Sequence, residues 1–181
     1  MKRSALFLLV WVVIGEGIAP GQTEPFKAGS WDLEIKAAYV QPIIYSTEKL
    51  YGGTVGASWY IFDRFTLGVE MMGYHIDQYQ ETDLGGGALT SRWHFLQRGP
   101  WSLFIDGAGG LTIASHPIPE FGSHFNFTGQ GGFGATWKVD ERFFLIGGAR
   151  YFHLSNGDMH GRIRNPSFNG VQYYVGLMVF P

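Results

Sequence analysis

Residues 30–42, SWDLEIKAAYVQP, decide the fold, because apolar and charged side chains alternate along them. Apolar side chains stand at the odd positions from Trp31 to Tyr39, and Asp32, Glu34 and Lys36 stand at even positions between them. Successive side chains of a β-strand point to opposite faces, so this spacing predicts a strand with one apolar and one charged face.

The same alternation recurs along the whole chain beyond residue 26, where no helical period lasts more than a turn or two. Odd positions carry the apolar side chains in nearly every repeat. We expect eight strands, at residues 30–42, 51–62, 65–76, 84–96, 101–114, 125–139, 143–155 and 169–180. Many strands of this kind, separated by turn residues, are typical of an all-β protein.

The connections between these segments alternate in length. Residues 63–64, 97–100 and 140–142 form short connections, whereas residues 43–50, 77–83, 115–124 and 156–168 form long ones. Short turns at one end and long loops at the other are typical of outer-membrane barrels. The sequence therefore predicts an eight-stranded antiparallel transmembrane β-barrel, with odd positions facing lipid and even positions facing the lumen.

The tryptophans and the even-numbered polar residues agree with this layout. Five tryptophans lie at segment ends beside the short connections, as an aromatic girdle at the periplasmic interface would: Trp31, Trp59, Trp93, Trp101 and Trp137. The inward set is Glu34, Lys36, Glu70, Arg92, His94, Asp106, Gln130, Lys138 and Arg150. A soluble lipocalin-like barrel is the alternative, but it would turn its apolar face inward and would not need every tryptophan at one rim.

The N-terminus predicts secretion. Met1, Lys2 and Arg3 begin the chain, an apolar run follows at residues 4–14, and small residues near Gly21 suit cleavage. That run is shorter than the ~20 residues that a membrane-spanning helix needs. We therefore expect a signal peptide at residues 1–21 and a barrel domain at residues 22–181, located in the bacterial outer membrane.

Composition restricts the function. The chain has 181 residues with 27 glycines, 17% aromatic and 15% charged residues, and no cysteine. Such low charge with so much glycine and aromatic content is unusual for a soluble domain. A net charge of −2 gives no indication of a nucleic-acid partner, and the lack of cysteine removes disulfide and thiol chemistry.

Candidate chemistry is concentrated in residues 150–169, RYFHLSNGDMHGRIRNPSFN. His153 and Ser155 share the outward face at the long-loop end of their segment, and Asn169 has the same parity at the start of the last one. A serine hydroxyl beside an imidazole that a third group orients is the minimum for nucleophilic acyl transfer. The pattern predicts this polar cluster on the lipid-facing wall.

These residues resemble the lipid A 3-O-deacylases of the outer membrane. The resemblance rests on His153-x-Ser155-Asn156-Gly157, on Asn165-Pro166 and on the aromatic-rich last strand. It implies that Ser155 attacks the 3-O-linked acyl ester of lipid A in lipopolysaccharide, that His153 takes its proton, and that Asn156 stabilises the oxyanion. We expect no cofactor, and the sequence does not decide whether calcium is needed.

One position departs from the family pattern. That pattern places a glutamate at the start of the last strand, where this chain has Asn169. An asparagine still accepts a hydrogen bond from the imidazole, but it cannot stabilise the imidazolium by charge. Outer-membrane phospholipase A also pairs H-x-S with asparagine. Asp158 is a substitute acid by its proximity in sequence.

The loop residues and the function allow alternative interpretations. A metal site from His116, His124 and His160 lacks carboxylates at ligand spacing. Arg162 and Arg164 would either meet lipid A phosphates or be solvated. Two function hypotheses follow: an outer-membrane esterase acting on lipid A, and a non-catalytic small barrel for adhesion, envelope anchoring or ligand binding.

Overall fold

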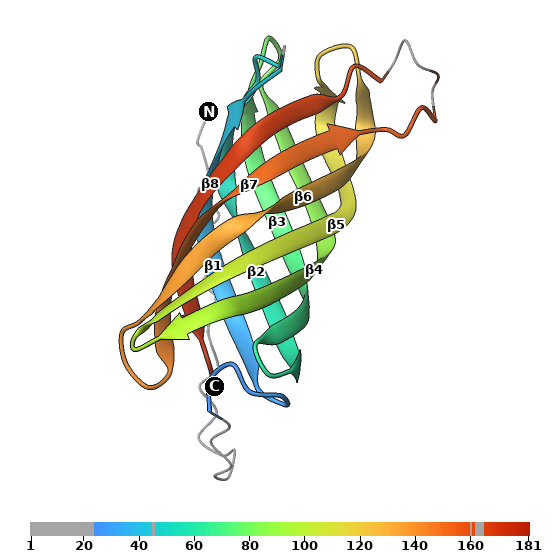
Figure 1. Cartoon of the computed structure of the whole chain (residues 1–181). Helices are drawn as coiled ribbons and strands as arrows, with labels where there is room; N and C mark the ends of the chain where they lie inside the picture. The colour runs from blue at the N-terminus through green and yellow to red at the C-terminus, as the bar shows by residue number, and fades with distance from the viewer. Residues whose placement is uncertain (1–23, 45, 160, 162–164) are drawn as a thin grey trace, which may run out of the picture.

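The computed structural model describes residues 24–44, 46–159, 161 and 165–181, and it is a closed antiparallel barrel of eight strands (Figure 1). Strands follow one another around the barrel in sequence order, and β8 pairs with β1 to close it. The predicted fold class is confirmed. The predicted signal peptide lies outside the described residues, so the domain boundary stays a prediction.

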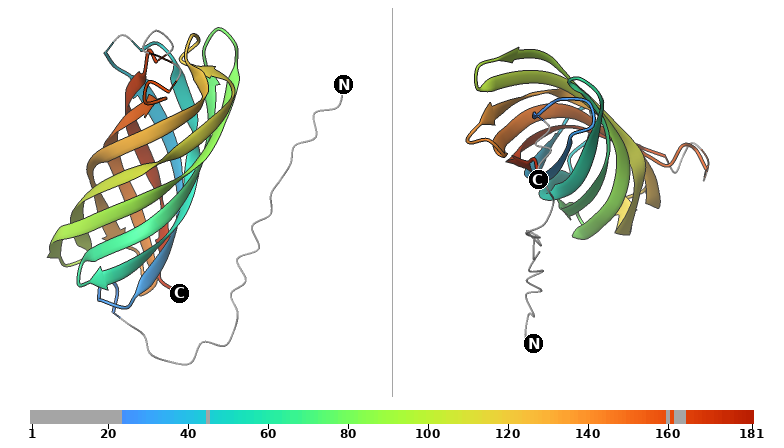
Figure 2. Two further views of the ribbon diagram at one scale, coloured as in Figure 1. Left: turned by 90° about the vertical axis from the view of Figure 1, so that its right-hand side faces the viewer. Right: turned by 90° about the horizontal axis from the view of Figure 1, so that it is seen from below.

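Each predicted segment corresponds to one strand. The strands are β1 (Trp31–Pro42), β2 (Lys49–Phe62), β3 (Phe65–Asp77), β4 (Thr82–Arg98), β5 (Trp101–Ile118), β6 (Ser123–Lys138), β7 (Phe143–Ser155) and β8 (Phe168–Val179). They are strongly inclined to the barrel axis (Figures 1 and 2). No helix among the described residues has the length and apolar character to cross a bilayer.

Two of the expected long loops are shorter than the sequence suggested. β5 continues to Ile118 and β6 begins at Ser123, so residues 119–122 alone connect them. Likewise, residues 78–81 connect β3 and β4. Pro117 and its polar neighbours favour a loop in sequence. The strand accommodates them through a register shift between Ile113 and Ile118.

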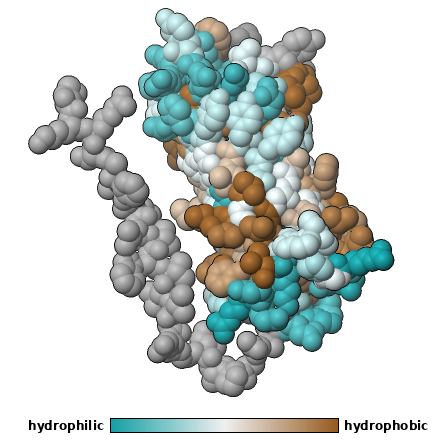
Figure 3. Space-filling view, turned by 90° about the vertical axis from the view of Figure 1, so that its left-hand side faces the viewer, coloured by the Kyte–Doolittle hydropathy of each residue, from teal (hydrophilic) through white to brown (hydrophobic). Residues whose placement is uncertain are grey.

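Odd-numbered side chains face outward, as the alternation predicts. The outer wall exposes aliphatic and aromatic side chains, including Ile35, Val69, Leu89 and Phe133. Figure 3 shows one face of this wall, where apolar residues form a band between hydrophilic regions toward both ends. A sheet that exposes apolar side chains around its outer face is stable in contact with lipid rather than water.

All five tryptophans among the described residues lie at the short-turn end, as predicted. Trp31 pairs with Trp59 across β1 and β2, and Trp101 pairs with Trp137 across β5 and β6. Phe65, next to a short turn, pairs with Trp93. The C-terminus lies at this end as well (Figure 1).

Charged side chains fill the middle of the lumen as a connected set. Lys36 Nζ lies 2.8 Å from Glu34 and 2.6 Å from Glu70, and Arg92 also pairs with Glu34. Arg150 contacts Asp106 at 2.7 Å and Glu70 at 3.2 Å. Each of these charges, Glu34, Lys36, Glu70, Arg92, Asp106 and Arg150, therefore has an opposite charge beside it, which offsets its loss of hydration. Lys138 alone of the predicted inward charges differs, since it is one-third exposed and pairs with Glu141 at the rim.

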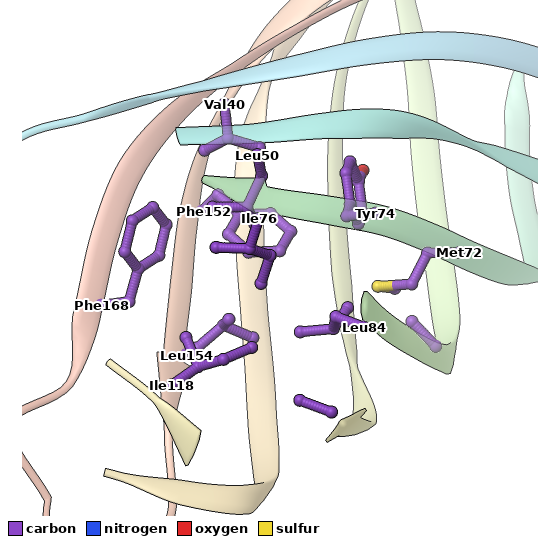
Figure 4. Packing of buried hydrophobic residues seen from close by; sticks show 12 residues of the cluster. Val40, Leu50, Met72, Tyr74, Ile76, Leu84, Ile118, Phe152, Leu154 and Phe168 are labelled. Atoms are coloured by element: carbon purple, nitrogen blue, oxygen red, sulfur yellow. The ribbon is translucent and has the colours of Figure 1, made fainter. Parts of the chain in front are cut away.

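Apolar clusters occupy both ends of the lumen, which the sequence reading did not anticipate. Toward the long loops, twelve buried residues pack together, among them Leu50, Ile76, Phe152 and Phe168 (Figure 4). At the short-turn end Phe26, which precedes β1, packs its ring against Tyr60, Phe144 and Phe180. Phe26 thus closes that mouth of the barrel.

Candidate active site

His153 and Ser155 lie on the outward face of β7, at the end nearest the long loops. Phe152 and Leu154 alternate with them and are completely buried in the lumen. His153 and Ser155 are half-buried, because neighbouring side chains on the wall cover part of each. The structure therefore places both predicted residues on the wall that faces lipid.

Asn169 lies directly opposite His153, across the antiparallel pair of β7 and β8 that stand side by side in Figure 1. Its Oδ1 is 2.8 Å from His153 Nδ1. With the amide oxygen as acceptor, the imidazole carries its proton on Nδ1 and keeps a lone pair on Nε2. The Nε2 lone pair is what a general base needs.

Tyr151 completes this arrangement, and sequence reasoning gave it no role. Its hydroxyl donates a hydrogen bond to the same Asn169 Oδ1. Its ring lies nearly parallel to the imidazole of His153, at 12° with 6.4 Å between centroids. The signal was present in the parity, since Tyr151 precedes His153 by two residues on the same face.

The backbone of Asn169 is held by the connection between β1 and β2. Its N–H donates to Ser46 Oγ at 3.1 Å, and its carbonyl accepts from the Ile43 N–H at 2.9 Å. These bonds tie a segment far away in sequence to the start of β8. The position from which the Asn169 side chain reaches His153 is therefore fixed.

A tight turn follows Ser155. Gly157 and Asp158 both adopt left-handed backbone conformations, with φ of 63° and 60°. The backbone N–H of Asn156, a residue that is 1% exposed, donates to Asn165 Oδ1 at 2.9 Å. Sequence reasoning quoted Asn165 but did not foresee this bond.

Asp158 has a different partner from the one considered. Its carboxylate accepts from Asn165 Nδ2 at 2.7 Å, so it supports the turn. The group that meets His153 is Asn169. No hydrogen bond joins Ser155 to His153 in the described part of the chain. Catalytic hydrogen bonds are often long in unliganded enzymes and tighten when substrate binds.

The other candidate histidines do not form a common site. His116 Nδ1 lies 3.4 Å from Ser115 Oγ, and His124 Nδ1 lies 3.0 Å from the carbonyl of Ala114. His160, Arg162 and Arg164 lie outside the described residues. Among the residues that are described, no group of three or more potential ligands is placed to hold a metal ion.

A second serine–histidine contact exists inside the barrel. His94 Nδ1 lies 2.5 Å from Ser102 Oγ, and both residues are buried. The ring of Phe26 packs on His94 at 4.5 Å between centroids, from the side of the short turns. A substrate in the membrane has no access to this pair, so the outward cluster is the candidate site.

Comparison with known proteins places the chain in a family. A family model described as Lipid A 3-O-deacylase (PagL) matches residues 43–178. A search of curated protein sequences gives no match.

Among solved structures, the crystal structure of the outer membrane enzyme PagL has a TM-score of 0.60 at 16% identity, covering 81% of this chain and 98% of that one. Neisserial surface protein A has a TM-score of 0.61 at 15% identity, covering 83% and 96%. The outer membrane protein OprG from Pseudomonas aeruginosa has a TM-score of 0.55 at 10% identity, covering 84% and 96%.

Identities this low show a common barrel fold, which by itself does not define a function. The family match carries more weight, because it covers three-quarters of the chain, from the first long connection to the end of β8. The chain therefore belongs to the lipid A 3-O-deacylase (PagL) family and is a protein of the bacterial outer membrane.

Proposed function

We propose that this protein hydrolyses the 3-O-linked acyl ester of lipid A in the outer leaflet of the outer membrane. Supporting this, the family consists of lipid A deacylases. The observation that carries the proposal is the hydrogen bond between His153 and Asn169 on the lipid-facing wall, with Ser155 on the same face. An ester in the membrane meets this group without leaving the bilayer.

The roles follow from the chemistry of an acyl-enzyme. Ser155 Oγ attacks the ester carbonyl while His153 Nε2 accepts the hydroxyl proton. Collapse of the tetrahedral intermediate breaks the bond to the sugar oxygen, and His153 returns the proton to that oxygen. A water molecule activated by His153 then attacks the acyl-serine, which releases the fatty acid and restores Ser155. Asn169 keeps the imidazole oriented throughout.

We assign the oxyanion to the turn that follows Ser155. The N–H of Asn156 is already donated to Asn165 and the Asn156 side chain is buried, so the donor in this assignment is the backbone N–H of Gly157 in place of the Asn156 side chain. The left-handed conformation of Gly157 presents its amide in the turn immediately after the nucleophile. Donors placed in advance at such a position are worth about 3–4 kcal/mol in other hydrolases.

The acyl chain has room beside His153. Gly129 lies opposite His153 on β6, and Gly109 lies opposite Gly129 on β5. A Cβ at either glycine would meet no atom within 4 Å, so the outer surface of β5 and β6 has a low wall there, where no side chain projects. Phe127 and Phe133 of β6 flank this surface. We propose that the scissile acyl chain lies over these glycines.

The decisive experiment is lipid A mass spectrometry on cells that express the protein or its variants. Expression of the unaltered protein should remove the 3-linked acyl chain. Ser155→Ala and His153→Ala should each reduce its release by at least about 10³-fold, and the double variant should be no worse. Ser115→Ala is a matched control, since Ser115 is also an outward serine close to a histidine, His116. Full activity in Ser155→Ala would disprove the assignment.

The second candidate is a barrel without catalysis. Two observations favour it: Ser155 makes no hydrogen bond to His153 among the described residues, and similar barrels include Neisserial surface protein A and OprG. Unchanged lipid A in cells that contain the folded, unaltered protein would support this candidate.

A further inference from the structure

Tyr151 lies on β7 beside the proposed catalytic residues, two positions before His153. It donates a hydrogen bond to Asn169 Oδ1, the atom that also faces His153 Nδ1. Asn169 therefore receives two hydrogen-bond donors on one oxygen.

An asparagine amide has two ends of opposite character. Its oxygen accepts, whereas its NH₂ group donates. With the oxygen toward His153, the imidazole carries its proton on Nδ1 and Nε2 is a base. With the NH₂ group toward His153, Nδ1 must accept and the proton moves to Nε2. The second tautomer cannot take a proton from Ser155. A carboxylate at this position has two acceptor oxygens and would not face the problem.

Because backbone contacts hold Asn169 in place, the main motion left to it is the rotation that exchanges its amide oxygen and NH₂ group. Ser46 Oγ and the Ile43 N–H hold its backbone on both sides. The side chain is then restrained by what it meets on the wall, namely His153 and Tyr151. The hydroxyl of Tyr151 meets the amide as a donor. A phenolic hydroxyl donates more strongly than it accepts, because its oxygen lone pair is delocalised into the ring, so it favours the amide oxygen over the NH₂ group.

We propose that Tyr151 is a positioning residue, whose hydroxyl fixes the Asn169 amide with its oxygen toward His153 and thereby selects the imidazole tautomer that serves as a base. This inference rests on the proposed function for its catalytic consequence. Its structural content, the tautomer of His153, does not depend on turnover.

The first test reads the tautomer directly. The protein labelled with ¹⁵N-histidine is refolded in detergent micelles, and long-range ¹H–¹⁵N correlations identify the protonated nitrogen of His153. The His153 signals are assigned by their loss in His153→Gln. We expect Nδ1–H in the unaltered protein and a substantial share of Nε2–H in Tyr151→Phe. Tyr173→Phe is the control, because Tyr173 is an exposed tyrosine on the same wall. An unchanged Nδ1–H tautomer in Tyr151→Phe would overturn the proposal.

The second test uses turnover of the lipid ester in mixed micelles. Tyr151→Phe should lower kcat about five- to tenfold, the value of one ordinary hydrogen bond, with KM unchanged. In the Asn169→Asp background the same substitution should cost less than about twofold, because a carboxylate needs no such orientation. Equal losses in both backgrounds, or none in either, would overturn the proposal. If no variant turns over ester while the tautomer changes as expected, the proposed function fails and the positioning role stands.

Discussion

At the scale of single residues, the site is built around a neutral third group. Asn169 accepts from both Tyr151 and His153, so it orients the imidazole without offering a negative charge. Parity places His153, Ser155 and Asn169 on one face, because a strand repeats every second residue, and it places Tyr151 there as well. The hydrogen bonds of Tyr151 and Asn165 do not follow from parity, because they depend on side-chain direction.

Substitution at Asn169 separates orientation from charge. A hydrogen bond to a charged partner is worth about 1.5–3 kcal/mol, so Asn169→Ala should slow ester hydrolysis roughly ten- to a hundredfold. Asn169→Asp keeps the acceptor and adds a charge that stabilises the imidazolium, so its activity should equal or exceed that of the unaltered protein. Fatty-acid release in mixed micelles measures both. A loss in Asn169→Asp as large as in Asn169→Ala would contradict the orienting role.

At the scale of the strands, the sequence predicts well which side chains face outward and which face inward. It predicts the ends of the strands poorly. All eight strands were expected, since lipid on one side and a packed lumen on the other enforce the alternation. The end of β5 was placed too early, because Pro117 resembles a loop signal. A register shift that absorbs such a residue leaves no mark in the sequence.

The low wall of β5 and β6 gives a prediction at this scale. Gly129→Leu places a bulky side chain where we position the acyl chain, and its Cβ would meet no atom within 4 Å. We expect kcat/KM for the ester to fall roughly tenfold or more, since a methylene group in a hydrophobic site changes it by about 10–200-fold.

Gly85→Leu is the matched control for Gly129→Leu. Gly85 is also outward, and a Cβ there meets nothing within 4 Å, but it lies on β4, opposite Ile113. Similar losses in the two variants would indicate a general effect on the wall and would rule out the acyl-chain position.

At the scale of the whole molecule, the sequence predicts the closed barrel and the polarity of its interior but not how the interior is arranged. The number of alternating segments and the charges at even positions predict the architecture. Which charges pair depends on the shear of the barrel: Arg150 on β7 reaches both Asp106 on β5 and Glu70 on β3. The sequence reading also missed the apolar clusters above and below the charged layer.

Removing one member of the charged layer should destabilise the entire barrel. Arg150→Met removes the nearest cation of Asp106 and one of the two cations beside Glu70, and breaking a buried pair in this way costs about 3–5 kcal/mol. Urea unfolding in lipid vesicles, followed by tryptophan fluorescence, should show a lower midpoint.

Lys138→Met is the comparison for Arg150→Met. Lys138 also forms an ion pair, but its partner Glu141 is largely exposed at the rim. Exposed pairs contribute about 0–1 kcal/mol, so this midpoint should barely change. Equal shifts of the midpoint for the two variants would show that the buried charges stabilise the barrel no more than the exposed pair does.

The two apolar ends of the lumen also bear on the permeability of the cell envelope. Leu50, Ile76 and Phe168 toward one mouth have no exposed surface, and Phe26 closes the other. Solutes therefore find no aqueous route through these layers, unlike the open lumen of a porin. Copies of this protein should therefore leave the permeability of the outer membrane to hydrophilic solutes unchanged.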